Sequence, residues 1–90
     1  MATHKLKITQ PFFDDVKNGI KKFELRRNDR NFKVGDEVYL QEYDMVHHLF
    51  SGEEVYVKII YVLENRIGLE DDFCIFGFEI YNNQFEKRYE

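Results

Sequence analysis

The longest run of alternating apolar residues reads Glu53-Glu54-Val55-Tyr56-Val57-Lys58-Ile59-Ile60-Tyr61-Val62-Leu63. Successive side chains of a strand point to opposite faces, so the odd-numbered residues from Val55 to Leu63 share one apolar face. The even-numbered residues from Tyr56 to Val62 are also largely apolar, which predicts that part of the second face is covered as well. We therefore expect residues 53–63 to form the longest strand, away from an open sheet edge.

Shorter elements are predicted around this run. Strands are expected over residues 4–8, 21–27, 37–43 and 73–80, with a loop over residues 44–52. A helix is expected over residues 11–18, where Pro11 suits the first turn and Phe12, Phe13 and Val16 recur at helical spacing. Gly19 suits the left-handed residue that ends many helices.

These elements predict an α+β fold. About five strands and one clear helix indicate a mainly antiparallel sheet of five or six strands with one or two short helices. Such a sheet would curl into a small β-barrel, because curling hides the edges that short strands leave exposed.

Composition and length describe a single soluble domain over residues 1–90, with 43% hydrophobic and 33% charged side chains. Cys74 is the only cysteine and lies in an apolar run, so a buried and unreactive thiol is expected. The sequence contains neither an apolar signal core nor a run long enough to span a membrane, which predicts a cytoplasmic monomer without membrane contact. The polar residues 81–90 are expected to form a loosely docked, flexible tail.

The net charge of −4 conceals an asymmetry between the two parts of the chain. Residues 1–35 hold nine Lys or Arg against four Asp or Glu, whereas residues 36–90 hold four against thirteen. Two interpretations remain open: the two parts pair with each other in the fold, or the basic part forms a patch that attracts a polyanion.

Six of the cations lie within residues 19–36. This stretch contains Gly19-x-Lys21-x-x-Glu24-x-Arg26 and later Val34-Gly35-Asp36. Glu24 and Arg26 are two residues apart on a predicted strand and therefore share a face. The pattern indicates either a site for an anionic ligand or an ordinary ion pair on a half-exposed sheet.

Gly19-x-Lys21-x-x-Glu24-x-Arg26 after a short helix, followed by Val34-Gly35-Asp36 at the start of a strand, resembles the ASCH domains of the PUA-like superfamily. The chain more closely resembles the small DUF3850 family of bacteria and their phages, which suggests a bacterial or prophage protein. This resemblance rests on the stretch from Phe23 to Asp36, on His4-x-Leu6-x-Ile8, and on Glu42-Tyr43 with Tyr61-Val62-Leu63.

The resemblance implies a PUA-like barrel whose cleft binds RNA. Some small relatives of ASCH domains resemble amidohydrolases that act on acetylated cytidine, with a threonine nucleophile at the position of Glu24. Because this chain has a carboxylate there, the nucleophile of that mechanism is missing.

The leading hypothesis is a non-enzymatic module that binds RNA or a nucleotide-like ligand. Lys21, Glu24 and Arg26 would form the floor of its cleft, with Arg27 and Arg30 at the rim. If the protein is an enzyme, a small hydrolase of a modified nucleoside, Lys21 would act as base and Glu24 as acid–base partner. A phage accessory protein whose cleft binds a host protein is a third possibility.

Other residues carry weaker signals. Tyr39, Tyr43 and Tyr56 are candidates for stacking on bases, although packing on the sheet is the commoner role of tyrosine. The adjacent His47 and His48 lack the spaced partners of a zinc site, so no metal and no cofactor is expected. Asp36 is interpreted as a turn-forming residue.

Overall fold

The computed structural model describes residues 1–81 and consists of five strands and one short helix. The elements are β1 (Thr3–Ile8), α1 (Phe12–Lys17), β2 (Phe23–Arg27), β3 (Glu37–Asp44), β4 (Leu49–Glu64) and β5 (Phe73–Ile80). Of the predicted tail, only Tyr81 lies within the described residues. The helix found in residues 1–81 is not long and apolar enough to cross a membrane.

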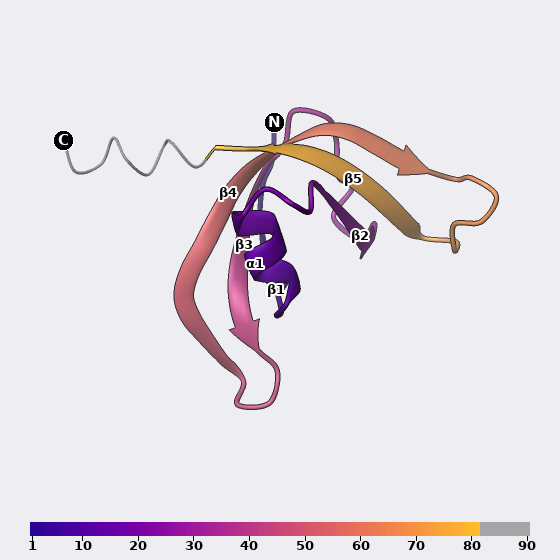
Figure 1. Cartoon of the computed structure of the whole chain (residues 1–90). Helices are drawn as coiled ribbons and strands as arrows, with labels where there is room; N and C mark the ends of the chain where they lie inside the picture. Colours follow the sequence, from indigo (N-terminus) through magenta and orange to yellow (C-terminus); the bar gives the residue numbers. More distant parts are fainter. Residues whose placement is uncertain (82–90) are drawn as a thin grey trace.

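The five strands form one sheet in the order β1-β3-β4-β5-β2. β1 runs parallel to β3, and the other three pairings are antiparallel. Figure 1 shows that the sheet curls into a half-barrel, with α1 inside its curve. The prediction of a curled, mainly antiparallel sheet is confirmed, and β4 occupies its centre as expected. β1 and β2 are left as the two edge strands.

The curl comes largely from β4, which is longer than predicted and irregular in two places. The predicted loop over residues 44–52 is wrong at its end, because Leu49 and Phe50 already pair with Asp44 and Tyr43. From Phe50 to Glu54 the strand advances four residues while β3 advances two, from Tyr43 to Gln41. A second bulge lies between Ile59 and Tyr61. Extra residues on one strand bend it and increase its twist.

The second bulge overturns the predicted face of β4. Val55, Val57 and Ile59 are buried as expected, but Tyr61 is 62% exposed. Ile60 is the extra residue, so the alternation shifts by one and Val62, rather than Tyr61, packs against the core. Both faces of this segment are apolar, so the sequence pattern does not show that a bulge changes which residues face the core.

The core fills the concave side of the sheet and is closed by α1. Phe13 and Val16 of the helix are buried there, together with Cys74, Phe76 and Phe78 of β5. Cys74 is completely buried, as predicted. Burial, followed by the nearby carboxylates of Glu64 and Asp29, raises the pKa of its thiol and so disfavours the reactive thiolate.

Phe12 departs from the predicted helix face. Its side chain is 48% exposed, whereas Phe13 is 1% exposed. Neighbouring residues of a helix point about 100° apart, so a helix this short cannot bury both rings against one surface. Phe12 is thereby left free to line a cavity beside the core.

Candidate functional site

The turn that follows α1 places Lys21 beside the sheet. Gly19 has a φ of +78°, a conformation that glycine adopts without strain, and its amide donates to the carbonyl of Val16. The amides of Ile20 and Lys21 both donate to the carbonyl of Asp15, at 2.9 and 3.0 Å. The helix end is therefore tied to the start of the next segment, which fixes where Lys21 leaves the turn.

The edge strand β2 turns its polar face inward. Glu24 and Arg26 lie opposite Phe76 and Cys74 of β5, whose side chains are completely buried, and Glu24 itself is 4% exposed. The apolar side chains of Phe23 and Leu25 point outward and are about half exposed. This inversion of the usual pattern places a carboxylate and a guanidinium at the border of the core.

Glu24 joins two cations in one cluster. Its Oε2 forms an ion pair with Nζ of Lys21, and its Oε1 accepts a hydrogen bond of 2.9 Å from Nε of Arg26. Nζ of Lys21 also donates to the backbone carbonyl of Phe23 at 2.7 Å. The cluster thus holds two positive charges and one negative charge, and it is mostly shielded from solvent.

Arg26 of β2 and Arg30 of the turn after it both reach the edge strand β1. Nη2 of Arg26 donates to the carbonyl of Lys7 at 2.6 Å, and Nη1 of Arg30 donates to the carbonyl of Lys5 at 3.0 Å. Both acceptors belong to β1, an edge strand whose outer carbonyls have no neighbouring strand to bond. Arg26 and Arg30 therefore close the half-barrel with side chains in place of a backbone ladder.

A cavity of about 530 Å³ opens next to this cluster. It lies between the end of β1, the start of α1 and β2, and is lined by Lys7, Ile8, Thr9, Phe12, Lys21, Phe23, Glu24, Leu25 and Arg26. The ammonium of Lys21 lies 4.9 Å from the ring centre of Phe23 and 5.7 Å from that of Phe12. Both cations of the cluster thus face a space that is otherwise mainly apolar.

The structure brings Lys21, Glu24 and Arg26 together but separates the other predicted site residues from them. Arg27 lies over the ring of Phe73, 4.8 Å from its centre, and does not line the cavity. Arg30 lies against β1, where it donates to the carbonyl of Lys5.

The tyrosines also lie elsewhere. Tyr39 and Tyr56 stack on each other at 4.8 Å, next to residues whose side chains point into the core, and so occupy the opposite, outer face of the sheet. Tyr43 packs edge-on against Phe50, under the ammonium of Lys7. The aromatic residues that line the cavity are Phe12 and Phe23.

Sequence reasoning missed a buried pair formed by His4 and Asp36. Nε2 of His4 lies 2.9 Å from Oδ2 of Asp36, and both residues are buried. Burial alone would raise the pKa of Asp36, but hydrogen bonds from His4 and from the amides of Ala2 and Lys33 outweigh it, and the pKa is lowered. Asp36 is thus a turn residue, as predicted, that also fastens β1 to the turn before β3.

Metal binding has no support in the part of the chain that the structure describes. No group of three or more His, Cys, Asp and Glu side chains is arranged there to hold an ion. His47 instead hydrogen-bonds through Nδ1 to Oδ2 of Asp44, at 2.8 Å.

Comparison with known proteins identifies relatives that share most of the described region. Residues 3–78 match a family described as "Domain of unknown function (DUF3850)". The chain is also 37% identical over 68 residues to a protein of Escherichia phage P2, described as an uncharacterized 12.9 kDa protein in the GpA 3' region. This alignment covers 76% of the chain but 61% of the phage protein, so the relative extends beyond the shared part.

Proposed function

This chain belongs to the DUF3850 family, and we propose that it is an ASCH-like module of the PUA-like type that binds single-stranded RNA or a nucleotide-like ligand between β1 and β2. One observation carries the proposal. Lys21 and Arg26 line a cavity of about 530 Å³ together with the aromatic residues Phe12 and Phe23. This volume lies within the range of small-molecule sites.

The chemistry of the cavity suits a ligand with a flat ring and a negative charge. A phosphate would bind Lys21 and the donors of Arg26 that remain beyond those facing Glu24 and Lys7, since a guanidinium has five N–H groups. A base would pack against Phe12 or Phe23, because aromatic rings are platforms for unstacked bases. Glu24 holds both cations in place, so the ligand meets them already oriented.

Chemical-shift mapping with short oligonucleotides and free nucleotides tests this function. Amide shifts should concentrate at Lys21, Glu24, Arg26 and the Thr9–Phe12 segment. Lys21→Ala removes one charged contact and should weaken binding by about 1.5–3 kcal/mol. Lys17→Ala is the matched control, because Lys17 is an exposed lysine of the neighbouring helix that does not line the cavity. Shifts that cluster on the outer face of the sheet would contradict the proposal.

A second candidate function is hydrolysis of a modified nucleoside, and one observation favours it. Thr9 lines the same cavity as Lys21 and Glu24 and is the hydroxyl-bearing residue among its described lining residues, although position 24 carries no nucleophile. Turnover of acetylated cytidine by the wild type, lost in both Thr9→Val and Lys21→Ala while binding survives, would establish catalysis. Binding without turnover would leave the protein as a binding module.

A further inference from the structure

The hairpin formed by β3 and β4 carries a second cavity, separate from the one between β1 and β2. Its volume is about 680 Å³, and among residues 1–81 Thr9 is the one that lines both cavities. Figure 1 shows the hairpin reaching beyond α1 at one end of the half-barrel. Its walls come from Thr9, Gln10, Glu42, Tyr43, Asp44, Met45, Val46, Leu49, Phe50 and Ser51.

The tip of this hairpin is apolar and exposed. Met45, Val46, Leu49 and Phe50 lie within six residues of one another and are 67%, 81%, 62% and 51% exposed. Isolated apolar side chains are common on protein surfaces, but a group of four around one cavity is typical of an interaction site. The apolar tip (residues 45–50) therefore provides a place for an apolar side chain of a partner.

The same hairpin is acidic, and its basic side chains are those of His47 and His48. Residues 41–54 contain Glu42, Asp44, Glu53 and Glu54 but no Lys or Arg. Within the described residues, one of these acids, Glu53, forms an ion pair with a lysine, Lys17, at 3.2 Å. A hydrogen bond from the ring of His47, then those from the amides of His47 and Val46, lower the pKa of Asp44. The hairpin thus keeps a net negative charge, with the ammonium of Lys7 as the neighbouring cation, 4.3 Å from the ring centre of Tyr43.

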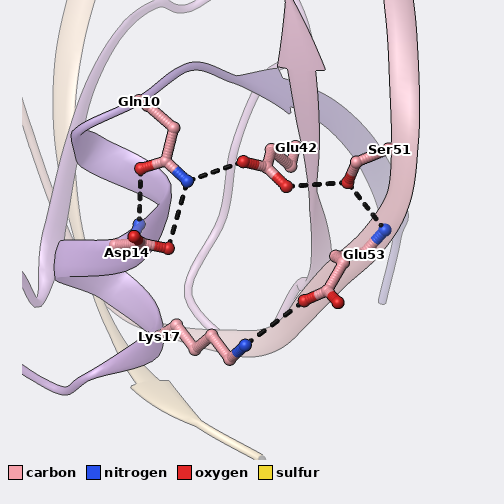
Figure 2. Close-up of polar contacts among 6 residues, drawn as sticks. All are labelled: Gln10, Asp14, Lys17, Glu42, Ser51 and Glu53. Atoms are coloured by element: carbon pink, nitrogen blue, oxygen red, sulfur yellow. Dashed lines mark hydrogen bonds and ion pairs between the residues drawn. The ribbon is translucent and has the colours of Figure 1, made fainter.

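A polar network holds this acidic surface in place. Figure 2 shows Gln10 between the first turn of α1 and Glu42 of β3. Nε2 of Gln10 donates to Oε2 of Glu42 at 2.6 Å, and Oγ of Ser51 donates to Oε1 of the same carboxylate at 2.7 Å. These bonds brace the hairpin against the helix, so a partner would meet an ordered surface and lose less conformational entropy on binding.

We propose that the apolar tip, together with the acidic residues on either side of it in the sequence (Glu42, Asp44, Glu53 and Glu54), binds a cationic amphipathic segment of another protein. An apolar side chain of that segment would occupy the cavity, and its Lys or Arg side chains would face Glu42, Asp44 and Glu54. The charge selects this occupant over two others: RNA and an anionic membrane surface would both be repelled by Glu42, Asp44 and Glu54. Apart from Thr9, the described residues that line this surface differ from those that line the cavity between β1 and β2.

A synthetic peptide of about four helical turns, with leucine on one face and lysine on the other, serves as the probe. Titration into the isotopically labelled protein should shift the amides of residues 42–51, and binding should weaken as salt is added. A peptide with serine in place of leucine should bind at least about tenfold more weakly, because the apolar anchor is lost. Equal binding of the two peptides would overturn the proposal, since charge alone would then explain it.

Variants of the protein locate the binding surface. Leu49→Ser should weaken peptide binding about tenfold and Glu54→Lys should reduce it further at low salt. Ile67→Ser is the matched control, because Ile67 is fully exposed in the loop between β4 and β5 and its change should leave binding unaltered. Equal losses in Leu49→Ser and Ile67→Ser would contradict the assignment.

The same labelled protein distinguishes the other occupants. Single-stranded RNA or vesicles of anionic phospholipid that shift residues 42–51 would overturn the choice of a protein partner. Self-association in sedimentation that Leu49→Ser abolishes would replace the foreign segment with a second copy of this chain. Peptide binding by a protein that stays monomeric supports the proposal.

Discussion

Glu24 is the residue on which the cluster between β1 and β2 depends. Its two oxygens separate the charges of Lys21 and Arg26, which would otherwise repel each other at the border of the core. In Glu24→Gln the new amide nitrogen would face one of the cations as a donor facing a donor. We expect the free energy of unfolding to fall by about 1.5–3 kcal/mol, measured by urea denaturation.

The control for this change is Glu54→Gln, which alters an exposed carboxylate on the β3–β4 hairpin and should change stability by less than about 0.5 kcal/mol. Similar losses in both variants would mean that net charge, rather than the cluster, determines the effect.

The lowered pKa of Asp36 predicts how the stability of the fold depends on pH. Its pKa in the folded protein is lower than the ordinary value of 3.8, so its bonds to His4 and to two backbone amides stabilise the fold above that pH. The stabilisation is lost as the pH falls through the folded pKa, because the protonated carboxyl group no longer accepts all these bonds. Asp36→Asn should therefore lose about 1.5–3 kcal/mol at pH 7 and much less at pH 2–3, as measured by denaturation across this range. A difference that is constant with pH would contradict this role of the carboxylate.

Among the elements, β4 tests the effect of a single extra residue. Because the bulge at Ile60 shifts the alternation, Val62 faces the core and Tyr61 faces solvent. Val62→Ala should lower the free energy of unfolding by about 1–2 kcal/mol, whereas Tyr61→Ala should change it by less than about 0.5 kcal/mol. An unbroken alternation predicts the reverse order, so thermal denaturation of the two variants decides between them.

The sequence predicts most of the elements, while their pairing and facing depend on contacts between distant residues. The alternation in β1 and β5 correctly places Leu6 and Phe76 in the core, because apolar residues at alternate positions of each strand are buried on the same face. It fails in β4, where both faces are apolar and a bulge leaves no local signal. The parallel pairing of β1 with β3 joins segments more than thirty residues apart and has no sequence signature of its own.

The candidate site likewise contains residues that the local sequence predicts and residues that only contacts between distant segments bring in. Lys21, Glu24 and Arg26 are recognisable because the motif places them two or three residues apart around one turn and one strand. Phe12 and Thr9 are not, because they reach the cavity only when the segment after β1 folds over β2. The adjacent phenylalanines of α1 offer the one available hint, since one of the two rings had to lie outside the core.

At the scale of the whole molecule, the charge asymmetry of the chain largely persists in the fold. Within residues 1–81, Lys17–Glu53 is the ion pair that joins a lysine or arginine of the basic part to an acid of residues 36–81. The other pairs with Lys or Arg, Lys21–Glu24 and Arg26–Glu24, lie inside the basic part itself. Within residues 1–81, direct ion pairs therefore neutralise little of either part, and attraction of a polyanion to the basic residues around β2 is a prediction of the proposed function.

This separation predicts a salt dependence that locates RNA on the basic side. Binding of single-stranded RNA should weaken as salt rises, because each phosphate contact releases condensed counterions, with a slope of about −0.7 in log–log form per contact. Lys21→Gln should make the slope shallower by about one such contact. Lys17→Gln should leave the slope unchanged, because that lysine already pairs with Glu53 beside the acidic hairpin. Fluorescence anisotropy at several salt concentrations measures all three slopes, and a wild-type slope near zero would rule out recognition through phosphates.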